Sequence, residues 1–581
     1  MQKDWGGRIS VALAYPNVYR IGMSNLGFQV VYALLNRRQD VVAERFFLPD
    51  VQEMSPTGDS GKGLVSVESL SPLQKFDLVA FSLSFENDYS NILKILQLGK
   101  IPLLSRERTD FHPLIAAGGI NTFLNPEPLA AFFDFFLLGE AEGIFDSFMD
   151  LFRDLKRFNT DRREIIKIMA REASSLYVPS FYSIEYYDNG LIKSRHVIDP
   201  SIPESIPVSR LDLDTLPVRR STILTRDTEF SGKVLVELAR GCGRSCRFCA
   251  AGYVYRPPRF HDEGVLSSMI EEILEEGHPL GLLSACVSDV PGIENLTGLI
   301  VERGGRYSVS SLRADSLTQD MATHLWEAGQ RSIAIAPEAG SERLRRVINK
   351  HLTQKQIIDA VKMIAKTGDF SLRLYFMIGL PTETREDVEE IVSLVKKIKH
   401  HMVKESSTRG KIRQIKLSVN CFIPKPFTPF QWFPMEDLSS LKDKQRRLKK
   451  ALSREGGVKV SFDVSKWAYI QTLLSVGDRR VSSLLLALHE NDGDWTKTFR
   501  NRDLNPDFYV YRRKSFREIL PWDFIDHGIR REHLIKESML ALRAEESETC
   551  RVGECTRCGV CGQRNKDELS LHKALSGGEE L

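Results

Sequence analysis

The stretch Glu237-Leu-Ala-Arg-Gly-Cys242-Gly-Arg-Ser-Cys246-Arg-Phe-Cys249 directly follows an apolar, strand-like run. Its three cysteines are separated by three and then two residues, so one short loop carries three thiols. Three thiolates can hold three corners of a cubane 4Fe-4S cluster and leave the fourth iron open for a substrate group. A zinc knuckle is the alternative, but zinc usually takes a fourth ligand and no candidate lies nearby in the sequence. The loop therefore favours an iron–sulfur cluster.

Strands and helices alternate on the C-terminal side of this loop. Apolar, strand-like runs span residues 234–238, 282–287, 307–312, 332–336, 372–378 and 415–421, and helical patterns fill the gaps. Six βα units over residues 231–435 are too few to close an eight-stranded barrel. The pattern predicts a partial (β/α)6 barrel with the cysteine loop after its first strand.

The cysteine motif after the first strand of such a barrel resembles the radical S-adenosylmethionine (SAM) superfamily. The resemblance implies an enzyme whose 4Fe-4S cluster is bound by Cys242, Cys246 and Cys249, with SAM chelated at the open iron. It also implies a one-electron donor, such as flavodoxin or ferredoxin. One electron then cleaves the sulfonium of SAM to give a 5′-deoxyadenosyl radical.

The same resemblance implies SAM contacts at the carboxyl ends of the barrel strands, where barrel active sites lie. Ser288-Asp289 stands where the family usually has Gly-Gly-Glu, and the turn from Gly379 to Thr384 resembles the family's Gly-x-Pro-x-Glu-Thr turn. Each of these positions also suits an ordinary turn or helix cap. The implied SAM-binding residues are Phe248, Ser288, Arg313, Glu338, Gly379 and Glu383.

Residues 1–160 also alternate between short apolar strands and helices, which predicts a doubly wound α/β sheet with helices on both faces. This region resembles the flavodoxin-like cobalamin-binding domain that precedes many radical SAM barrels. The Asp-x-His-x-x-Gly motif is absent, so any bound cobalt would lack that histidine ligand. A flavodoxin-like sheet without cofactor is the alternative. The implied cobalamin contacts are Ser24, Gly27, Ser82, Gly118, Gly119, Gly139 and Glu140.

The remaining segments are a connector and a C-terminal region. Residues 161–230 contain a hairpin-like stretch that turns at Asp188-Asn189-Gly190 and a proline-bearing linker. Residues 436–581 are predicted to be mainly helical, with a basic run at 442–450. Their tail carries Cys550, Cys555, Cys558 and Cys561, four thiols that suit either zinc or a fully ligated auxiliary iron–sulfur cluster.

Composition limits the classes of function. The 581-residue chain has 80 Lys and Arg against 77 Asp and Glu, which excludes an obligate polyanion binder of the histone kind. No run approaches the ~20 apolar residues that span a bilayer. We therefore expect a cytoplasmic protein with no membrane partner, in which clustered cysteines indicate metal rather than disulfides.

Three hypotheses follow. The first is a radical SAM enzyme that performs cobalamin-linked methyl transfer or a related modification of an unknown substrate. The second is a methylthiotransferase-like radical SAM enzyme that modifies RNA or a ribosomal protein, with the N-terminal domain as a scaffold. The third is a non-enzymatic cobalamin or iron–sulfur sensor. The sequence names neither a substrate nor an acid–base pair at the reacting atom.

Overall fold

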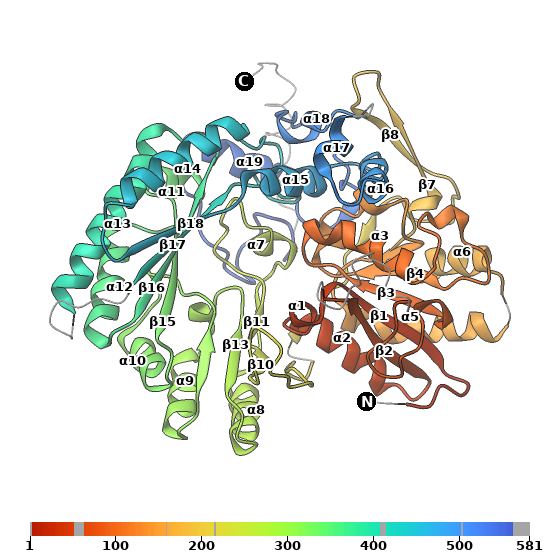
Figure 1. Cartoon of the computed structure of the whole chain (residues 1–581), viewed down its shortest axis with the longest axis horizontal. Helices are drawn as coiled ribbons and strands as arrows, with labels where there is room; N and C mark the ends of the chain where they lie inside the picture. Colours follow the sequence, from red (N-terminus) through yellow and green to blue (C-terminus); the bar gives the residue numbers. More distant parts are fainter. Residues whose placement is uncertain are drawn as a thin grey trace. The chain divides into compact units, whose positions relative to one another are not determined.

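The computed structural model describes residues 3–50, 63–158, 160–213, 216–406, 414–500 and 504–561 (Figure 1). The chain divides into two compact units. Unit 1 comprises residues 1–236, 273–281 and 469–526, and unit 2 comprises residues 237–272, 282–468 and 527–581. The C-terminal region is therefore divided between the units, and the four predicted boundaries stay a prediction.

Unit 1 contains a six-stranded sheet in the order β2-β1-β3-β4-β5-β6. The first five strands are parallel and β6 is antiparallel to β5. The order 2-1-3-4-5 is that of flavodoxin-like doubly wound sheets, which confirms the predicted fold. The strands are β1 (Ile9–Val18), β2 (Val41–Leu48), β3 (Leu78–Ser82), β4 (Leu114–Gly118), β5 (Phe135–Leu137) and β6 (Leu176–Tyr177).

Burial explains why these runs form strands. The first eight residues of β1 are all buried, as expected of a central strand covered on both faces. Helix α5 contacts both α2 and α6, whereas α3 packs with α16. The Asn25 side chain caps α2 by accepting from the Phe28 amide at 2.9 Å. The helices are α2 (Leu26–Arg37), α3 (Tyr89–Leu98), α4 (Ile120–Leu124), α5 (Ala141–Arg157), α6 (Arg162–Glu172) and α16 (Val481–Glu490).

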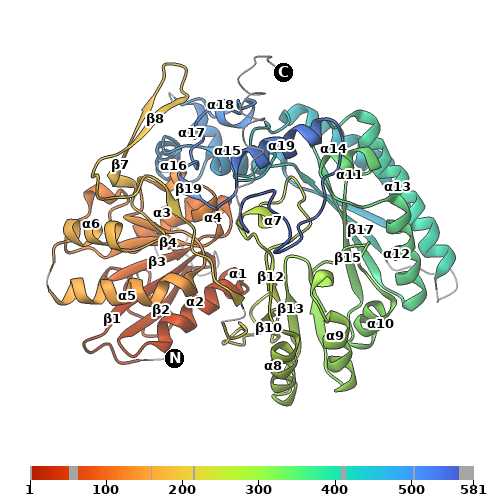
Figure 2. The same ribbon diagram turned by 180° about the vertical axis from the view of Figure 1, so that it is seen from behind.

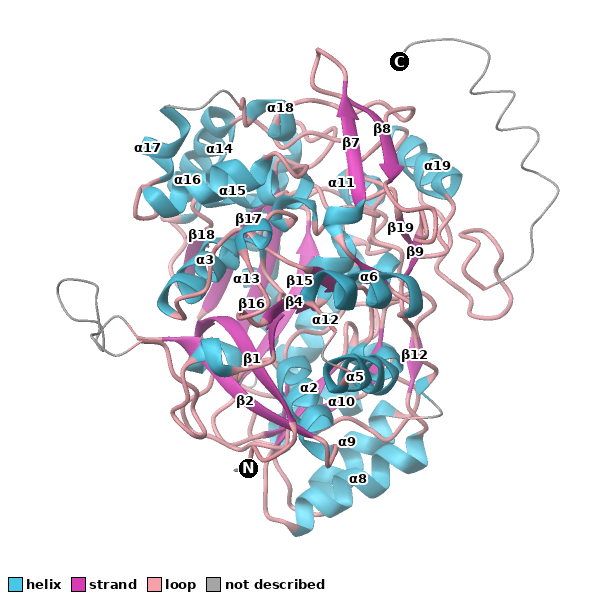
Figure 3. Ribbon diagram, turned by 90° about the vertical axis from the view of Figure 1, so that its right-hand side faces the viewer, coloured by secondary structure: helices cyan, strands magenta, loops and turns pink. Residues whose placement is uncertain are grey.

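The predicted hairpin is present in unit 1 as β7 (Tyr182–Tyr186) and β8 (Ile192–Val197) (Figure 3). A short strand from the linker, β9 (Ile206–Pro207), pairs in parallel with β19 (Ile525–Asp526). The C-terminal part of unit 1 is otherwise helical and includes α17 (Trp495–Arg500) and α18 (Asp507–Val510).

The barrel strands form two sheets, β10-β13-β14 and β15-β16-β17-β18. A parallel bridge between Leu312 and Ile335 joins them, and β15 to β18 are parallel throughout. Five strands lie where the sequence predicts them. The strand predicted at 282–287 begins and ends earlier, as β13, because residues 287–289 form a 3-10 turn, and β18 adds a seventh strand. The strands are β10 (Val234–Glu237), β13 (Leu280–Leu283), β14 (Tyr307–Val309), β15 (Ser332–Glu338), β16 (Ser371–Ile378), β17 (Ile415–Cys421) and β18 (Val458–Phe462).

Helices follow the barrel strands and lie outside them (Figure 2). Capping boxes begin two of these helices, at Thr353 with Gln356 and at Thr384 with Asp387. These helices are α8 (Glu263–Glu275), α9 (Ile293–Glu302), α10 (Gln319–Glu327), α11 (Glu342–Val347), α12 (Gln354–Thr367), α13 (Arg385–Glu405) and α14 (Leu438–Leu452). Helix α15 (Ser465–Val476) is divided between the two units, and α19 (Arg531–Leu542) precedes the tail of unit 2. Among the described helices, none has the length and apolar character needed to cross a membrane.

Candidate active site

The cysteine loop is closed at its base by a short antiparallel ladder. Strand β11 (Ala239–Arg240) pairs with β12 (Arg259–Phe260). Gly241 enters the loop with φ +82°, and a Cβ there would lie 2.5 Å from the carbonyl oxygen of Tyr255. Only glycine tolerates both this φ and this approach, so the entry to the loop is determined locally.

Cys242, Cys246 and Cys249 are electrostatic neighbours in this loop. Burial, together with the charges of Cys246 and Cys249, raises the pKa of the Cys242 thiol to about 11. Burial and Cys246 also raise the pKa of Cys249, and Lys350 opposes them. Among the residues that the structure describes, no three His, Cys, Asp or Glu side chains stand where they could jointly ligate a metal ion. The donor set, three thiols on one loop, still fits a cubane with one open iron.

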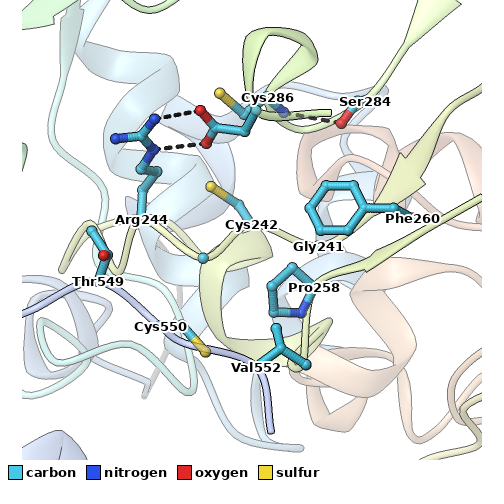
Figure 4. Close-up of a pocket in the computed structure, with 12 residues that line it drawn as sticks. Gly241, Cys242, Arg244, Pro258, Phe260, Ser284, Cys286, Thr549, Cys550 and Val552 are labelled. Atoms are coloured by element: carbon cyan, nitrogen blue, oxygen red, sulfur yellow. Dashed lines mark hydrogen bonds and ion pairs between the residues drawn. The ribbon is translucent and has the colours of Figure 1, made fainter. Parts of the chain in front are cut away.

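A chain of ion pairs crosses the loops that follow the barrel strands. Arg244, inside the cysteine motif, donates through Nε to Asp289 at 2.7 Å and through Nη2 to the other oxygen of the same carboxylate (Figure 4). Its Nη1 donates to Asp315 at 3.1 Å, and Arg313 Nε donates to Asp315 at 2.9 Å. These bonds tie the cysteine loop to the residues after β13 and β14.

The chain continues to Lys350 and Glu338. Arg313 Nη2 donates to the Lys350 carbonyl at 2.7 Å, and Lys350 Nζ lies 3.1 Å from Glu338 Oε1. Lys350 is only 7% exposed. Burial disfavours its charge, but Glu338 and Cys246 outweigh burial and the pKa of Lys350 is raised. A fixed positive charge therefore faces the thiols.

A cavity of about 320 Å³ lies against the cysteine loop. That volume is at the lower end of small-molecule sites. Its walls come from three parts of the chain: Gly241, Cys242, Gly243, Arg244, Pro258 and Phe260 near the loop, Ser284, Cys286 and Asp289 after β13, and Thr549, Cys550 and Val552 from the C-terminal tail (Figure 4).

Comparison with known proteins identifies the family of this loop and its surroundings. Residues 236–395 match the family model of the radical SAM superfamily, and residues 27–179 match the model of radical SAM proteins, N-terminal. The chain belongs to the radical SAM superfamily. The uncharacterized protein MJ0966 of Methanocaldococcus jannaschii is 31% identical over 478 residues, which cover 82% of this chain and 90% of that protein. The family is one of enzymes that use a 4Fe-4S cluster and SAM, which favours the enzyme over the sensor hypothesis.

Other similarities are weaker. The tRNA-2-methylthio-N(6)-dimethylallyladenosine synthase of Ehrlichia canis is 25% identical over 295 residues, which cover 46% of this chain and 59% of the synthase. The radical SAM methyltransferase TsrM from Kitasatospora setae, solved with cobalamin and a 4Fe-4S cluster, has a TM-score of 0.46 at 13% identity, covering 73% of this chain and 74% of TsrM. The cobalamin-dependent enzyme OxsB has a TM-score of 0.45 at 14% identity, covering 87% of this chain and 64% of OxsB.

Four of the six SAM contacts predicted in this radical SAM enzyme lie around the cysteine loop. Arg313 and Glu338 belong to the ion-pair chain. Ser288, which directly precedes Asp289 in the sequence, has its Oγ 2.7 Å from Ser316 Oγ. Phe248 packs against a buried apolar cluster that includes Phe430. Their contact with SAM stays a prediction.

Gly379 and Glu383 have a role within the protein. Glu383 accepts from the Leu380 amide at 3.2 Å and from Lys444 at 2.7 Å. Burial raises the pKa of the Glu383 carboxyl although Lys444 opposes it. A Cβ at Gly379 would lie 2.9 Å from the Leu441 side chain. The turn is therefore held against α14, and Lys444, a member of the basic run, is a partly buried ion-pair partner.

Arg247 fastens the motif to the C-terminal part of unit 2. It is 0% exposed, and its Nε donates to Glu537 on α19 at 3.1 Å. Its other nitrogens donate to the backbone carbonyls of Arg346, Val347 and Glu545. Sequence reasoning missed this contact because the partners lie about 100 and 290 residues away.

Sequence reasoning also missed Cys286, Asp315 and Lys350. Cys286 stands alone in the sequence, yet it lines the cavity with Cys242. Its position at the end of a predicted strand was the signal that could have found it. Cys421, in contrast, is 4% exposed and belongs to the core.

In unit 1, two of the predicted cobalamin-contact glycines serve the chain's own packing. Gly119 has φ +104°, and a Cβ would lie 2.4 Å from the carbonyl oxygen of Leu83. Gly139 has φ +111°, and a Cβ would lie 2.3 Å from the carbonyl oxygen of Ser209. Gly118 differs, because a Cβ there would meet nothing within 4 Å.

Of the other predicted cobalamin contacts in unit 1, one is buried and bonded within the protein, and the rest are exposed or partly exposed. Glu140 is buried and accepts from the Leu211 amide at 3.1 Å. Ser24 donates to the Arg20 carbonyl at 2.7 Å and remains partly exposed. Gly27 is exposed, and Ser82, at the end of β3, is partly exposed. Binding of cobalamin by any of them stays a prediction.

Residues 475–479 cover the loop after β4 within unit 1. Asn125 donates to the carbonyls of Ser475 and Gly477 at 3.0 and 2.8 Å. Glu127 is 0% exposed and accepts from Arg479 Nε at 2.9 Å and from the Tyr177 hydroxyl. Protein atoms therefore occupy this part of the carboxyl edge.

Proposed function

We propose that this radical SAM enzyme cleaves SAM reductively beside Cys242, Cys246 and Cys249 and transfers a methyl group with the help of cobalamin held by unit 1. The observation that carries the first part is the three-thiol loop, which is closed by a ladder and opens on a cavity. When bound, the cluster supplies the one-electron reduction of SAM, with flavodoxin or ferredoxin as the source of the electron.

The residues around the loop suit the charges of SAM and of a thiolate-bound cluster. SAM carries an ammonium and a carboxylate, and the ion-pair chain offers carboxylates at Asp289 and Glu338 and a guanidinium at Arg313. Lys350 and Arg313 are close enough to Cys246 to stabilise negative charge there. Within a largely buried site these interactions are stronger than they would be in water.

Support for cobalamin comes from the order of the unit 1 sheet. The order in which strands are added reverses between the parallel strands β1 and β3, and doubly wound sheets bind ligands at that point. The open space beside Gly118 fits a ligand that approaches the backbone. We assign Ser24, Ser82 and Gly118 to the binding edge, and cobalamin would serve there as a methyl carrier.

Anaerobic reconstitution with iron, sulfide and cobalamin tests both parts. We expect 5′-deoxyadenosine by mass spectrometry and corrinoid absorption that survives desalting. Gly118→Leu should remove the corrinoid, whereas Gly6→Leu, where a Cβ meets only Asp4 at 3.9 Å, should retain it. If the wild-type protein retains no corrinoid, the proposal that unit 1 binds cobalamin is contradicted, and unit 1 is left as a scaffold.

Modification of RNA or of a ribosomal protein is the second candidate. Residues 475–479 cover part of the unit 1 edge, which favours a scaffold. Helix α14 exposes Lys442, Arg446, Lys449 and Lys450, although Arg446 also faces Asp443 at 3.8 Å. Binding of bulk tRNA that weakens with salt and with charge reversal at Lys442, Lys449 and Lys450 would support this candidate. If no tRNA binds at low salt, modification of RNA is excluded, and modification of a ribosomal protein is left.

A further inference from the structure

The tail after α19 runs along the cysteine loop within unit 2. The Ser547 amide donates to Asn349 Oδ1 at 2.9 Å, and the Asn349 side chain in turn donates to the Ser245 carbonyl at 3.2 Å. The Cys550 amide donates to the Gly243 carbonyl at 2.7 Å. Thr549, Cys550 and Val552 line the cavity beside the cysteine loop, so the tail forms one of its walls.

Cys555 and Cys558 lie on a compact turn in the tail. Cys555 and Cys558 are separated by two residues, and Gly559 follows with φ +90°. A Cβ at Gly559 would lie 2.8 Å from the Arg530 side chain, and the Arg530 amide donates to the Cys558 carbonyl at 2.9 Å. Two cysteines at this spacing on a tight turn are typical of one half of a tetrahedral zinc site.

Two guanidinium groups lie beside these thiols, and Glu537 and Glu548 line the gap among them. Arg256 is 3% exposed and lies beside Cys550 and Cys558. Arg557 Nε donates to the Cys555 sulfur at 3.2 Å. The charges of Cys555, Cys558 and Cys561 all reach Cys550. A zinc ion with four thiolates carries a net charge of −2, which two permanently charged guanidinium groups would balance.

A gap of about 10 Å³ lies among these residues. Cys550, Cys555 and Cys558 line it, and Cys561 does not. The other lining residues are Ser245, Arg256, His533, Glu537, Glu548 and Arg557. Its size suits a single small atom and excludes an organic ligand. In the described part of the chain no three cysteines meet in ligating positions, and this applies equally to Cys242, Cys246 and Cys249.

We propose that Cys550, Cys555, Cys558 and Cys561 bind one zinc ion, which fastens the tail over the cysteine loop and so determines one wall of the SAM cavity. Four deprotonated thiols this close repel one another, and a divalent cation removes that repulsion. The knuckle-like turn and the one-atom gap favour a single ion over a four-iron cubane. The effect on SAM rests on the proposed function, whereas the zinc content does not.

Metal analysis of a Cys242→Ala/Cys246→Ala/Cys249→Ala variant tests the site without the SAM cluster. We expect one zinc per chain and, after exchange with cobalt, the thiolate-to-cobalt absorption of a tetrahedral site. Adding Cys555→Ser, or the more buried Cys558→Ser, should remove the zinc, whereas adding Cys421→Ala should not. Iron with sulfide in place of zinc, or neither metal, would overturn the proposal.

Hydrogen exchange tests the effect on the wall. In Cys555→Ser, amides of residues 545–552 should lose at least tenfold protection, while those of α12 stay unchanged. In the loaded enzyme the same variant should raise KM for SAM more than it lowers kcat. Unchanged protection would overturn the role of the zinc. Zinc binding in a wild-type protein that cleaves no SAM would leave the site intact and contradict only the proposed function.

Discussion

The two parallel sheets of this protein use their carboxyl edges differently. In unit 1, Gly119, Gly139 and the loop after β4 contact the chain's own backbone and residues 475–479. In the barrel, the residues after β10 and β13 border a cavity and an ion-pair chain. Both edges carry the glycines and polar residues expected of ligand sites. Such residues therefore mark a strand end without deciding whether a ligand or the protein itself occupies it.

Loss of one cluster thiol should have the largest effect. We expect Cys246→Ala to reduce 5′-deoxyadenosine formation to background after reconstitution, because the cluster would lose one of three protein ligands. Circular dichroism should stay unchanged. Cys421→Ala, which removes a core thiol, serves as the control. Cleavage that persists in Cys246→Ala would refute the site.

Removal of Arg479, the ion-pair partner of Glu127 where residues 475–479 cover the unit 1 sheet edge, should destabilise unit 1. Arg479→Met leaves Glu127 buried without its cation, which costs about 3–5 kcal/mol in comparable buried pairs. Hydrogen exchange of peptides from β4 and β5 in increasing urea measures the loss. Arg385→Met removes an exposed helical pair with Glu389 and should cost less than about 0.5 kcal/mol. Equal effects of the two changes would show that the covered edge is not structural.

A buried acid next to the open part of the unit 1 edge should make stability depend on pH. Burial raises the pKa of Asp88 from 3.8 to about 6, so its ionised form is disfavoured in the folded state. Asp88→Asn should therefore stabilise unit 1 by about 3 kcal/mol at pH 7.5. The gain should shrink as pH falls through 6 and vanish below about 4, where the acid is neutral in both states.

Urea unfolding at several pH values measures this difference. Asp154→Asn, in an exposed pair with Arg153, should show little change at any pH. A gain that is independent of pH would mean that the charge of Asp88 does not limit the stability of this edge.

Weakening the ion-pair chain beside the barrel cavity should have the smallest effect. Asp289→Asn removes the charge that faces Arg244, so the cysteine loop is held less firmly. We expect KM for SAM to rise about tenfold, equivalent to ~1.4 kcal/mol, with iron content unchanged. Asp359→Asn, in an exposed pair with Lys355, is the control. A KM equal to that of wild type would exclude Asp289 from the SAM site.

Much of the fold could be read from local patterns. The run at 415–421 forms β17 with the predicted bounds, because its apolar residues alternate with polar ones and are the buried members of the strand. The strand at 458–462 could not be placed in the barrel from its sequence. Its parallel pairing with β17 depends on α14 returning the chain to that edge.

By itself, the sequence determined the chemistry: three closely spaced thiols at the end of a strand, a doubly wound sheet before them and four thiols in the tail. Only the tertiary structure decided which strand ends are open, because side chains such as Arg479 and Arg247 have partners hundreds of residues away. It also brought Cys286, Asp315 and Cys550 to the cysteine loop. Spacing along the chain determines which groups share a loop, whereas burial and ion pairing between distant segments determine what faces them.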